Sequence, residues 1–264
     1  MKMKIENWEQ INDDMQRGYS YAANNKSIQA CREWKKTWRA IVAAMDSGGY
    51  ASLEDFDEDF PGLQSVYNWA SDYELELYDS LDDDYSLVGE RLSFCTEYFA
   101  RVAEKEVQNS LNMRSAIANS YFRLGMEEEG EKRYMALTGE YPTWGWGWAH
   151  WADEYCDREG EKGYARAIEI LNEALNIDGI KPKFVINERL KDTYEKIGMQ
   201  EEADLIDVDE WDYGVPLSEI RVVFDAMKGE LDALVNEIFE PLADTDSQGE
   251  DDSHEPQGTS HEEP

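Results

Sequence analysis

The chain has 264 residues, and its 59 acidic side chains outnumber its 25 basic ones, which gives a formal net charge of -34 at pH 7. Binding to nucleic-acid phosphates needs a basic patch, whereas the basic residues here are interspersed with acids, so we expect no direct nucleic-acid binding. Aromatic residues make up 12% of the chain and include nine tryptophans, so it can bury a substantial core despite its charge.

No apolar run approaches the roughly eighteen residues that a membrane-spanning helix needs. Glu6 and Glu9 precede any hydrophobic stretch that could act as a signal peptide. We therefore expect a cytoplasmic protein with no membrane partner. The three cysteines, Cys31, Cys95 and Cys156, are far apart and each lies in an amphipathic segment, which predicts reduced, buried thiols and neither a metal site nor a cofactor.

Apolar residues recur at helical spacing along most of the chain, separated by Gly, Pro, Asn and Asp, and no series of strands is apparent. This pattern predicts an all-α protein of roughly eleven helices. In the N-terminal region, residues 1–108, an acidic loop at 52–62 separates the second apolar stripe from the third. The four stripes are Ile5, Trp8, Ile11, Met15 and Tyr19; Ile28, Cys31, Trp34, Trp38, Ile41, Val42 and Met45; Val66, Trp69, Tyr73 and Leu77; and Leu87, Leu92, Cys95, Phe99 and Val102.

The next region, residues 109–241, is expected to continue the first without a break. Its predicted helices span 109–124, 127–140, 143–158, 162–176, 183–197, 200–209 and 216–239. The last segment, residues 242–264, has eight acids, no Lys or Arg, and no Phe, Trp or Tyr, so it is predicted to be a disordered tail. Without those eight acids, 51 acids and 25 bases remain, so the folded body still carries about -26.

A degenerate repeat runs through residues 109–210, where Tyr121, Tyr155 and Tyr194 recur at intervals of 34 and 39 residues. The first unit resembles a tetratricopeptide repeat (TPR), and two further units follow it. The resemblance implies an α-α superhelix of stacked helix pairs. The residues that carry it are Ile117, Ala118, Tyr121, Gly125, Tyr134 and Pro142; Trp148, Trp151, Ala152, Tyr155, Ala167, Leu171 and Ala174; and Leu190, Tyr194, Gly198 and Ala203.

The phrase YPTWGWGWAHWADEY, together with YFRLGMEEEGEKRY, VYNWASDYELEL and RLSFCTEYF, is similar to a group of bacterial TPR-like proteins. Many of these proteins end in a SEC-C zinc motif, and the similarity extends over about residues 3–206. It implies a helical repeat scaffold with no established chemistry. An acidic tail stands here where the zinc cluster would be, so zinc binding is not expected.

The predicted helix 143–158, capped by Thr143, carries two stripes. Trp144, Trp148, Trp151 and Tyr155 form one stripe, which we interpret as core. The other stripe falls on the TPR positions that line the concave groove. With groove positions from the neighbouring units, the predicted partner-binding residues are Asn119, Trp146, His150, Asp153, Asp157, Arg189 and Asp192.

His150 is the only histidine in the folded body, and Asp153 lies one turn from it. Such a carboxylate could raise the pKa of the imidazole and orient it. No Ser or Cys nucleophile with recognisable spacing accompanies the pair, so we predict no catalytic residue. A groove contact and a structural hydrogen-bonded histidine both remain as interpretations.

Ser115 and Val185 occupy positions where carboxylate-binding TPR proteins carry basic residues, so such a clamp is not expected. Acids together with Trp146 instead suit a protein or peptide partner that is basic, or aromatic and basic. An acidic decoy that imitates nucleic acid is the alternative function, supported by net charge alone. A calcium loop at Asp55 is excluded, because Phe60 and Val66 replace the Gly and Glu that it requires.

Overall fold

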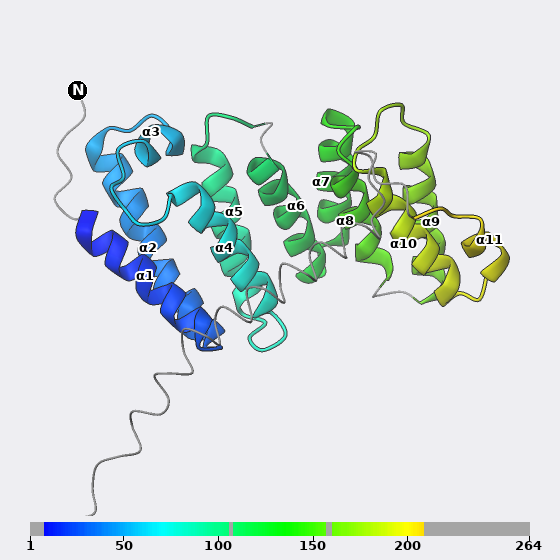
Figure 1. Ribbon diagram of the computed structural model, residues 1–264, viewed down its shortest axis with the longest axis horizontal. Helices are drawn as coiled ribbons and strands as arrows, with labels where there is room; N and C mark the ends of the chain where they lie inside the picture. The colour runs from blue at the N-terminus through cyan, green and yellow to red at the C-terminus, as the bar shows by residue number, and fades with distance from the viewer. Residues whose placement is uncertain (1–7, 106–107, 157–159, 209–264) are drawn as a thin grey trace, which may run out of the picture. The chain divides into compact units, whose positions relative to one another are not determined.

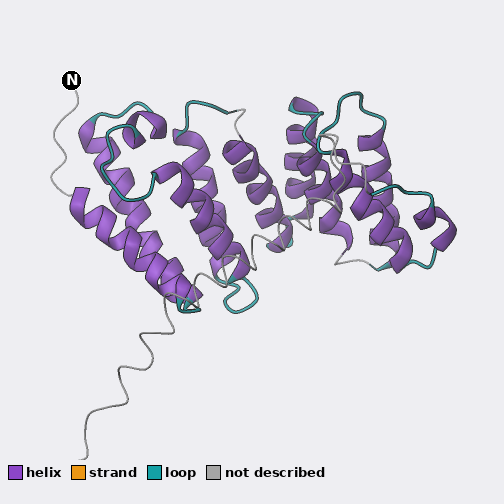
Figure 2. Cartoon of the chain, viewed as in Figure 1, coloured by secondary structure: helices purple, strands orange, loops and turns teal. Residues whose placement is uncertain are grey.

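The computed structural model describes residues 8–105, 108–156 and 160–208 (Figure 1). Over these ranges the chain forms eleven α-helices, and its one extended pairing is an isolated parallel bridge between Trp144 and Lys181 (Figure 2). The chain divides into two units, Met1–Val208 and Asp209–Pro264. The second unit, with the predicted helix 216–239 and the predicted tail, lies outside the described residues. The prediction of an all-α fold is confirmed.

The helices have amphipathic sequences, and the predicted apolar stripes form their buried faces. None of the described helices is both long and apolar enough to cross a membrane. Their bounds are α1 (Trp8–Ala23), α2 (Ser27–Gly48), α3 (Leu53–Asp57), α4 (Val66–Asp79), α5 (Leu87–Arg101), α6 (Gln108–Arg123), α7 (Glu127–Glu140), α8 (Gly145–Cys156), α9 (Glu161–Leu175), α10 (Lys183–Lys196) and α11 (Gln200–Asp204).

The helices of the first unit pack mainly against their neighbours in sequence. Helix α1 packs on α2, α6 on α7, and α8 on α9, so each forms a hairpin of two helices (Figure 1). Helix α6 also contacts α5 and α8, and α10 contacts α8 and α9, which links one pair to the next. This stacking of helix pairs is the TPR-like arrangement that the repeat predicted.

One turn recurs between the paired helices. The amide of Met126 donates to the carbonyl of Tyr121, and the amide of Met199 donates to that of Tyr194, both at 2.9 Å. Gly125 and Gly198, one residue earlier, have φ of 73° and 77°, which is the left-handed conformation that glycine adopts without strain. Lys26 makes the same bond to Tyr21 after Asn25, at φ 53°. The turn of the predicted repeat therefore also occurs at the N-terminal pair α1–α2.

Buried apolar side chains form two clusters, and α6 contributes to both. The first cluster spans α1 to α6 and contains Trp34, Trp38 and Trp69. The second spans α6 to α10 and contains Trp148 and Trp151. Helix α6 can serve two cores because its buried residues point to opposite sides, and the two cores meet along it.

Three local predictions were wrong. Helix α8 begins at Gly145 and not after Thr143, because Thr143 and Gly145 pair with the backbone of Lys181: the Lys181 amide donates to Thr143 at 2.8 Å, and the Gly145 amide donates to Lys181 at 2.7 Å. The acidic loop contains the short helix α3, whose Phe56 is fully buried. Cys31 and Cys95 are buried free thiols as predicted, whereas Cys156 is partly exposed.

Candidate functional site

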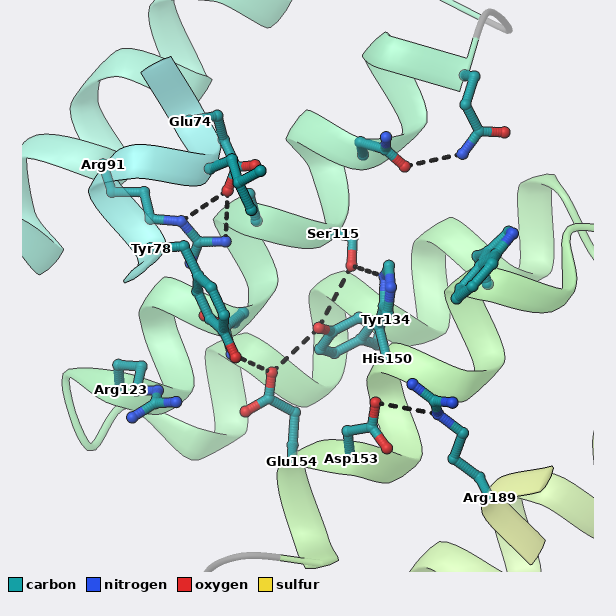
Figure 3. Close-up of a pocket in the computed structure, with 16 residues that line it drawn as sticks. Glu74, Tyr78, Arg91, Ser115, Arg123, Tyr134, His150, Asp153, Glu154 and Arg189 are labelled. Carbon is teal, nitrogen blue, oxygen red and sulfur yellow. Dashed lines mark hydrogen bonds and ion pairs between the residues drawn. The ribbon is translucent and has the colours of Figure 1, made fainter. Parts of the chain in front are cut away.

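A cavity of about 640 Å³ is lined by α6 and by residues of α4, α5, α7, α8 and α10, and α6, which contributes the most residues, is taken as its floor (Figure 3). Four α6 residues that face it are spaced one helical turn apart, which is why they share one side of the helix. The lining comprises Glu74, Leu75 and Tyr78 of α4; Arg91 of α5; Gln108, Asn112, Ser115, Ala116, Asn119 and Arg123 of α6; Tyr134 of α7; Trp146, His150, Asp153 and Glu154 of α8; and Arg189 of α10.

Five of the seven predicted partner-binding residues line this cavity together, namely Asn119, Trp146, His150, Asp153 and Arg189. Asp192 is exposed on α10 and does not line it. Asp157 lies outside the described residues. The repeat register therefore predicted residues of three helices, α6, α8 and α10, that line one cavity, but Asp192 is not among the lining residues.

Arg91 is the most buried cation of the cavity, with 5% of its surface exposed. Its guanidinium binds the Glu74 carboxylate through Nε at 2.7 Å and Nη2 at 2.6 Å, and Nη1 donates to Asn119 Oδ1 at 2.6 Å. Burial opposes the charge, but Glu74 more than compensates, so the pKa of Arg91 is raised. Arg91 therefore ties α4, α5 and α6 together at one wall.

Asn119 and Tyr134 hold the carboxylate of Glu154. The Asn119 amide donates to Glu154 Oε1 at 2.6 Å, and the Tyr134 hydroxyl donates to the same oxygen at 3.1 Å. Burial, followed by the charge of Glu154, raises the pKa of Tyr134 well above its ordinary value, so this phenol stays protonated and keeps donating. The bonds connect α6, α7 and α8.

His150 faces α6, where its Nδ1 lies 2.9 Å from Ser115 Oγ. Burial lowers the pKa of His150 to about 4, and the positive charges of Arg189 and Arg91 lower it further. The sequence suggested the opposite direction, from Asp153. Asp153 instead pairs with Arg189, with 3.5 Å between Oδ2 and Nε, and the imidazole is neutral at physiological pH.

The expected acidic groove is not what lines this cavity. Its charged residues are three acids, Glu74, Asp153 and Glu154, and three arginines, Arg91, Arg123 and Arg189, so the formal charge is balanced. In a chain with a net charge of -34 this balance is a local exception. The cavity is therefore lined by ion pairs and aromatic rings, and its electrostatic potential is not dominated by either charge.

The four lining residues of α4 and α5, namely Glu74, Leu75, Tyr78 and Arg91, were not predicted, because the repeat was recognised only from residue 109 onward. One signal in the sequence could have identified Arg91. It follows Leu87 by four residues and precedes Cys95 by four, so it lies on the apolar stripe of its helix. A cation at such a position must find an acid when it is buried.

The cavity offers hydrogen bonds, ion pairs and ring contacts. Ser115 beside His150 has the residue types of a nucleophile and a base, a pairing that the sequence did not indicate. Ser115, however, is only 4% exposed. Over the described ranges, no three His, Cys, Asp or Glu side chains converge in a way that could hold a metal ion.

Searches for similar proteins return no match among family models or curated proteins. Among solved structures, the chain is similar to TPR-like repeats from Podosopora anserina that are described as belonging to a kinesin light chain. That structure is 14% identical in sequence, with a TM-score of 0.45, over 76% of this chain and 92% of the other. A second structure with the same description is 13% identical, with a TM-score of 0.44 and the same two coverages; the first differs from it by one named substitution.

Proposed function

We propose that this protein is a non-catalytic scaffold for protein–protein interaction and that the cavity holds a peptide segment of its partner. The observation that carries the proposal is the convergence of polar groups and aromatic rings from six helices on one cavity of about 640 Å³. Concave sites of this size, with a few fixed polar groups, are the usual places for ligands.

The polar groups along α6 suit an extended chain. Gln108, Asn112, Ser115 and Asn119 lie at successive turns, so amide and hydroxyl groups follow one another along the floor. A peptide backbone offers donors and acceptors at regular intervals. Asn119 already bonds to Arg91 and Glu154, and Ser115 to His150, so Gln108 and Asn112 are the groups of this row that such a backbone would pair with first. Trp146, with the Phe184 ring 6.3 Å away, adds an aromatic contact at one end.

The partner chemistry expected from the sequence, a basic or aromatic and basic peptide, depends on acids being available in the cavity. The balanced charge weakens that expectation, whereas Trp146 still supports an aromatic contact. The acidic-decoy alternative rests on net charge, and a cavity lined by three arginines adds nothing to it.

Site-specific photocrosslinking tests the proposal. A photoreactive phenylalanine analogue replaces Asn112, which is partly buried on the cavity floor, in the full chain expressed in its native cells. The matched control carries the analogue at Arg39, which is exposed on α2 outside the cavity. We expect a discrete crosslinked partner at position 112 that is missing at position 39. Equal crosslinking at both positions, or none at position 112, would contradict the proposal.

A further inference from the structure

We propose that the bound segment carries a carboxylate beside an apolar side chain, and that Arg123 at the rim of the cavity holds this carboxylate. The inference rests on the proposed function and specifies its ligand. Both an Asp or Glu side chain and the C-terminal carboxylate of a chain present this chemistry.

The charged lining residues differ in what already binds them. Arg91 is bound to Glu74, and Arg189 is bound to Asp153 and, at 3.2 Å, to Glu188. Within the part of the chain that the structure describes, Arg123 makes no ion pair, and the contact of its guanidinium is with the Tyr78 ring, 5.9 Å from the centroid. A guanidinium has five N–H donors, so this residue retains the greatest capacity to bind an anion.

Contacts with Tyr78 and Tyr85 hold Arg123 at the rim of the cavity. The Tyr78 ring lies between Arg123 and Arg91, whose guanidinium is 4.8 Å from the same centroid (Figure 3). The Tyr85 hydroxyl donates to the backbone carbonyl of Arg123 and so attaches the preceding loop to the end of α6. Because Glu74 neutralises Arg91, the charge of Arg123 leaves this wall with a net positive charge, which favours a carboxylate over an ammonium group.

The surroundings of Arg123 supply the apolar part of the recognition. Leu75 is 55% exposed, Tyr78 40% and Leu124 39%. Leu75 and Tyr78 line the cavity, and Leu124 directly follows Arg123 in the chain. Exposed apolar side chains at the rim of a cavity mark interaction sites. The ligand therefore needs an apolar side chain close to its carboxylate.

A cationic ligand is disfavoured by the same contacts. The acids of the cavity already have partners: Glu74 accepts from Arg91, Asp153 pairs with Arg189, and Glu154 accepts from Asn119 and Tyr134. A lysine or arginine of the partner would have to compete with guanidinium groups for Glu74 and Asp153, and with the Asn119 amide and the Tyr134 hydroxyl for Glu154. A carboxylate at Arg123 displaces no protein group.

Affinity selection from two soluble pools of random hexapeptides, read by mass spectrometry, tests the inference. One pool has amidated C-termini and the other has free C-terminal carboxylates. The full chain is compared with Arg123→Glu, with the exposed control Arg39→Glu, and with Asn112→Trp, which fills the cavity from its floor. Circular dichroism and melting of each variant establish that it is folded.

We expect the full chain and Arg39→Glu to retain peptides with Asp or Glu next to Leu, Ile, Phe or Met, and Asn112→Trp to retain none of them. Arg123→Glu should bind these peptides at least about tenfold more weakly, because it removes a charge-assisted hydrogen bond to the carboxylate and places a like charge beside it. Enrichment in the amidated pool identifies a side-chain carboxylate as the source, and enrichment in the free-acid pool alone identifies a C-terminus.

Two results would overturn the inference. If the retained peptides are basic, or do not respond to Arg123→Glu, yet are lost in Asn112→Trp, the proposed function stands and the carboxylate assignment fails. If no peptide depends on an open cavity, both fail together.

Discussion

Ser115 and His150 join α6 to α8 through a hydrogen bond of 2.9 Å between Oγ and Nδ1. Arg91 of α5 and Arg189 of α10 line the same cavity, and their charges oppose protonation of the imidazole. The histidine therefore acts here as a neutral hydrogen-bonding group that holds two helices of the cavity together. Burial and the charges of Arg189 and Arg91, rather than the neighbouring Asp153, determine how His150 responds to pH.

The first prediction concerns that response. Burial, Arg189 and Arg91 lower the pKa of His150 in the folded chain to about 4, whereas an unfolded histidine titrates near about 6.5. The unfolded state thus binds more protons between these two values. The stabilising effect of a neutral His150 is fully present above about pH 6.5 and is lost as the pH falls toward 4.

By pH 5.5 the loss should reach about 1 kcal/mol, taking one pKa unit as about 1.4 kcal/mol. Urea unfolding at pH 7.5 and 5.5 measures it. His150→Gln, which retains a polar side chain but cannot titrate, should show a smaller fall in the free energy of unfolding between the two pH values. An equal fall in both proteins would mean that His150 is protonated without penalty and that the assigned environment is wrong.

The second prediction compares two tryptophans of α8. Trp148 is 5% exposed, and its Nε1 donates to the carbonyl of Pro142 at 2.9 Å, so it belongs to the core between helix pairs. Trp146 is partly exposed at the cavity. Trp148→Ala should lower the free energy of unfolding by about 3 to 5 kcal/mol, the usual cost of removing a buried large aromatic side chain.

Trp146→Ala should cost far less stability, and it should weaken peptide binding at the cavity. Chemical denaturation of both variants, with the same peptide titrated into each, separates the two roles. The reverse order of stability would place the cavity on the wrong face of α8.

The third prediction concerns Gly145, at the start of α8. A Cβ atom there would lie 2.6 Å from the carbonyl oxygen of Pro182, which is a backbone atom and cannot move aside cheaply. Gly145→Ala should therefore destabilise the chain by about 1 to 3 kcal/mol, as overpacking does. It should also disturb the bond from the Gly145 amide to Lys181.

Gly89 in α5 provides the matched control, because a Cβ atom there would meet nothing within 4 Å. Gly89→Ala should raise the free energy of unfolding by about 0.5 to 1 kcal/mol through helix propensity alone. Thermal melting of the two variants should shift in opposite directions. A stabilising Gly145→Ala would show that α8 and Lys181 do not approach as closely as described.

The sequence was sufficient to predict the helices and their buried faces. Trp34, Trp69 and Tyr73 recur at helical spacing, and each is at most 1% exposed. Gly125 and Gly198 likewise marked turns that have the left-handed conformation. Such features depend on residues a few positions apart, so periodicity and turn chemistry reveal them.

Contacts between distant segments were not predictable in the same way. The Thr143–Lys181 pairing moves the start of α8, and no local pattern in either segment indicates it. The cavity likewise combines features that local sequence patterns predict with contacts that they do not. Register placed Asn119 and His150 on one side of the stack, but the ion pair between Arg189 and Asp153 depends on how two helices pack. The charge balance of the cavity depends on the same packing, which local sequence patterns do not reveal.

The last prediction uses the charge of the whole chain to decide between an acidic and a basic ligand. A peptide with a carboxylate for Arg123 approaches a protein with a formal net charge of -34, so the long-range field slows its association. Added salt screens this repulsion, with a screening length of about 8 Å at 0.15 M. Association should therefore become faster as salt rises, while dissociation also becomes faster because the contact with Arg123 weakens. A basic peptide would show the opposite dependence of its association rate.

Stopped-flow fluorescence with a labelled peptide at several salt concentrations measures both the association rate and the dissociation rate. A chain that ends at Pro241 lacks eight acids, so its association rate should depend less on salt while its dissociation rate stays the same. An association rate that falls with salt in both chains would contradict the carboxylate ligand and would favour the basic partner expected from the sequence.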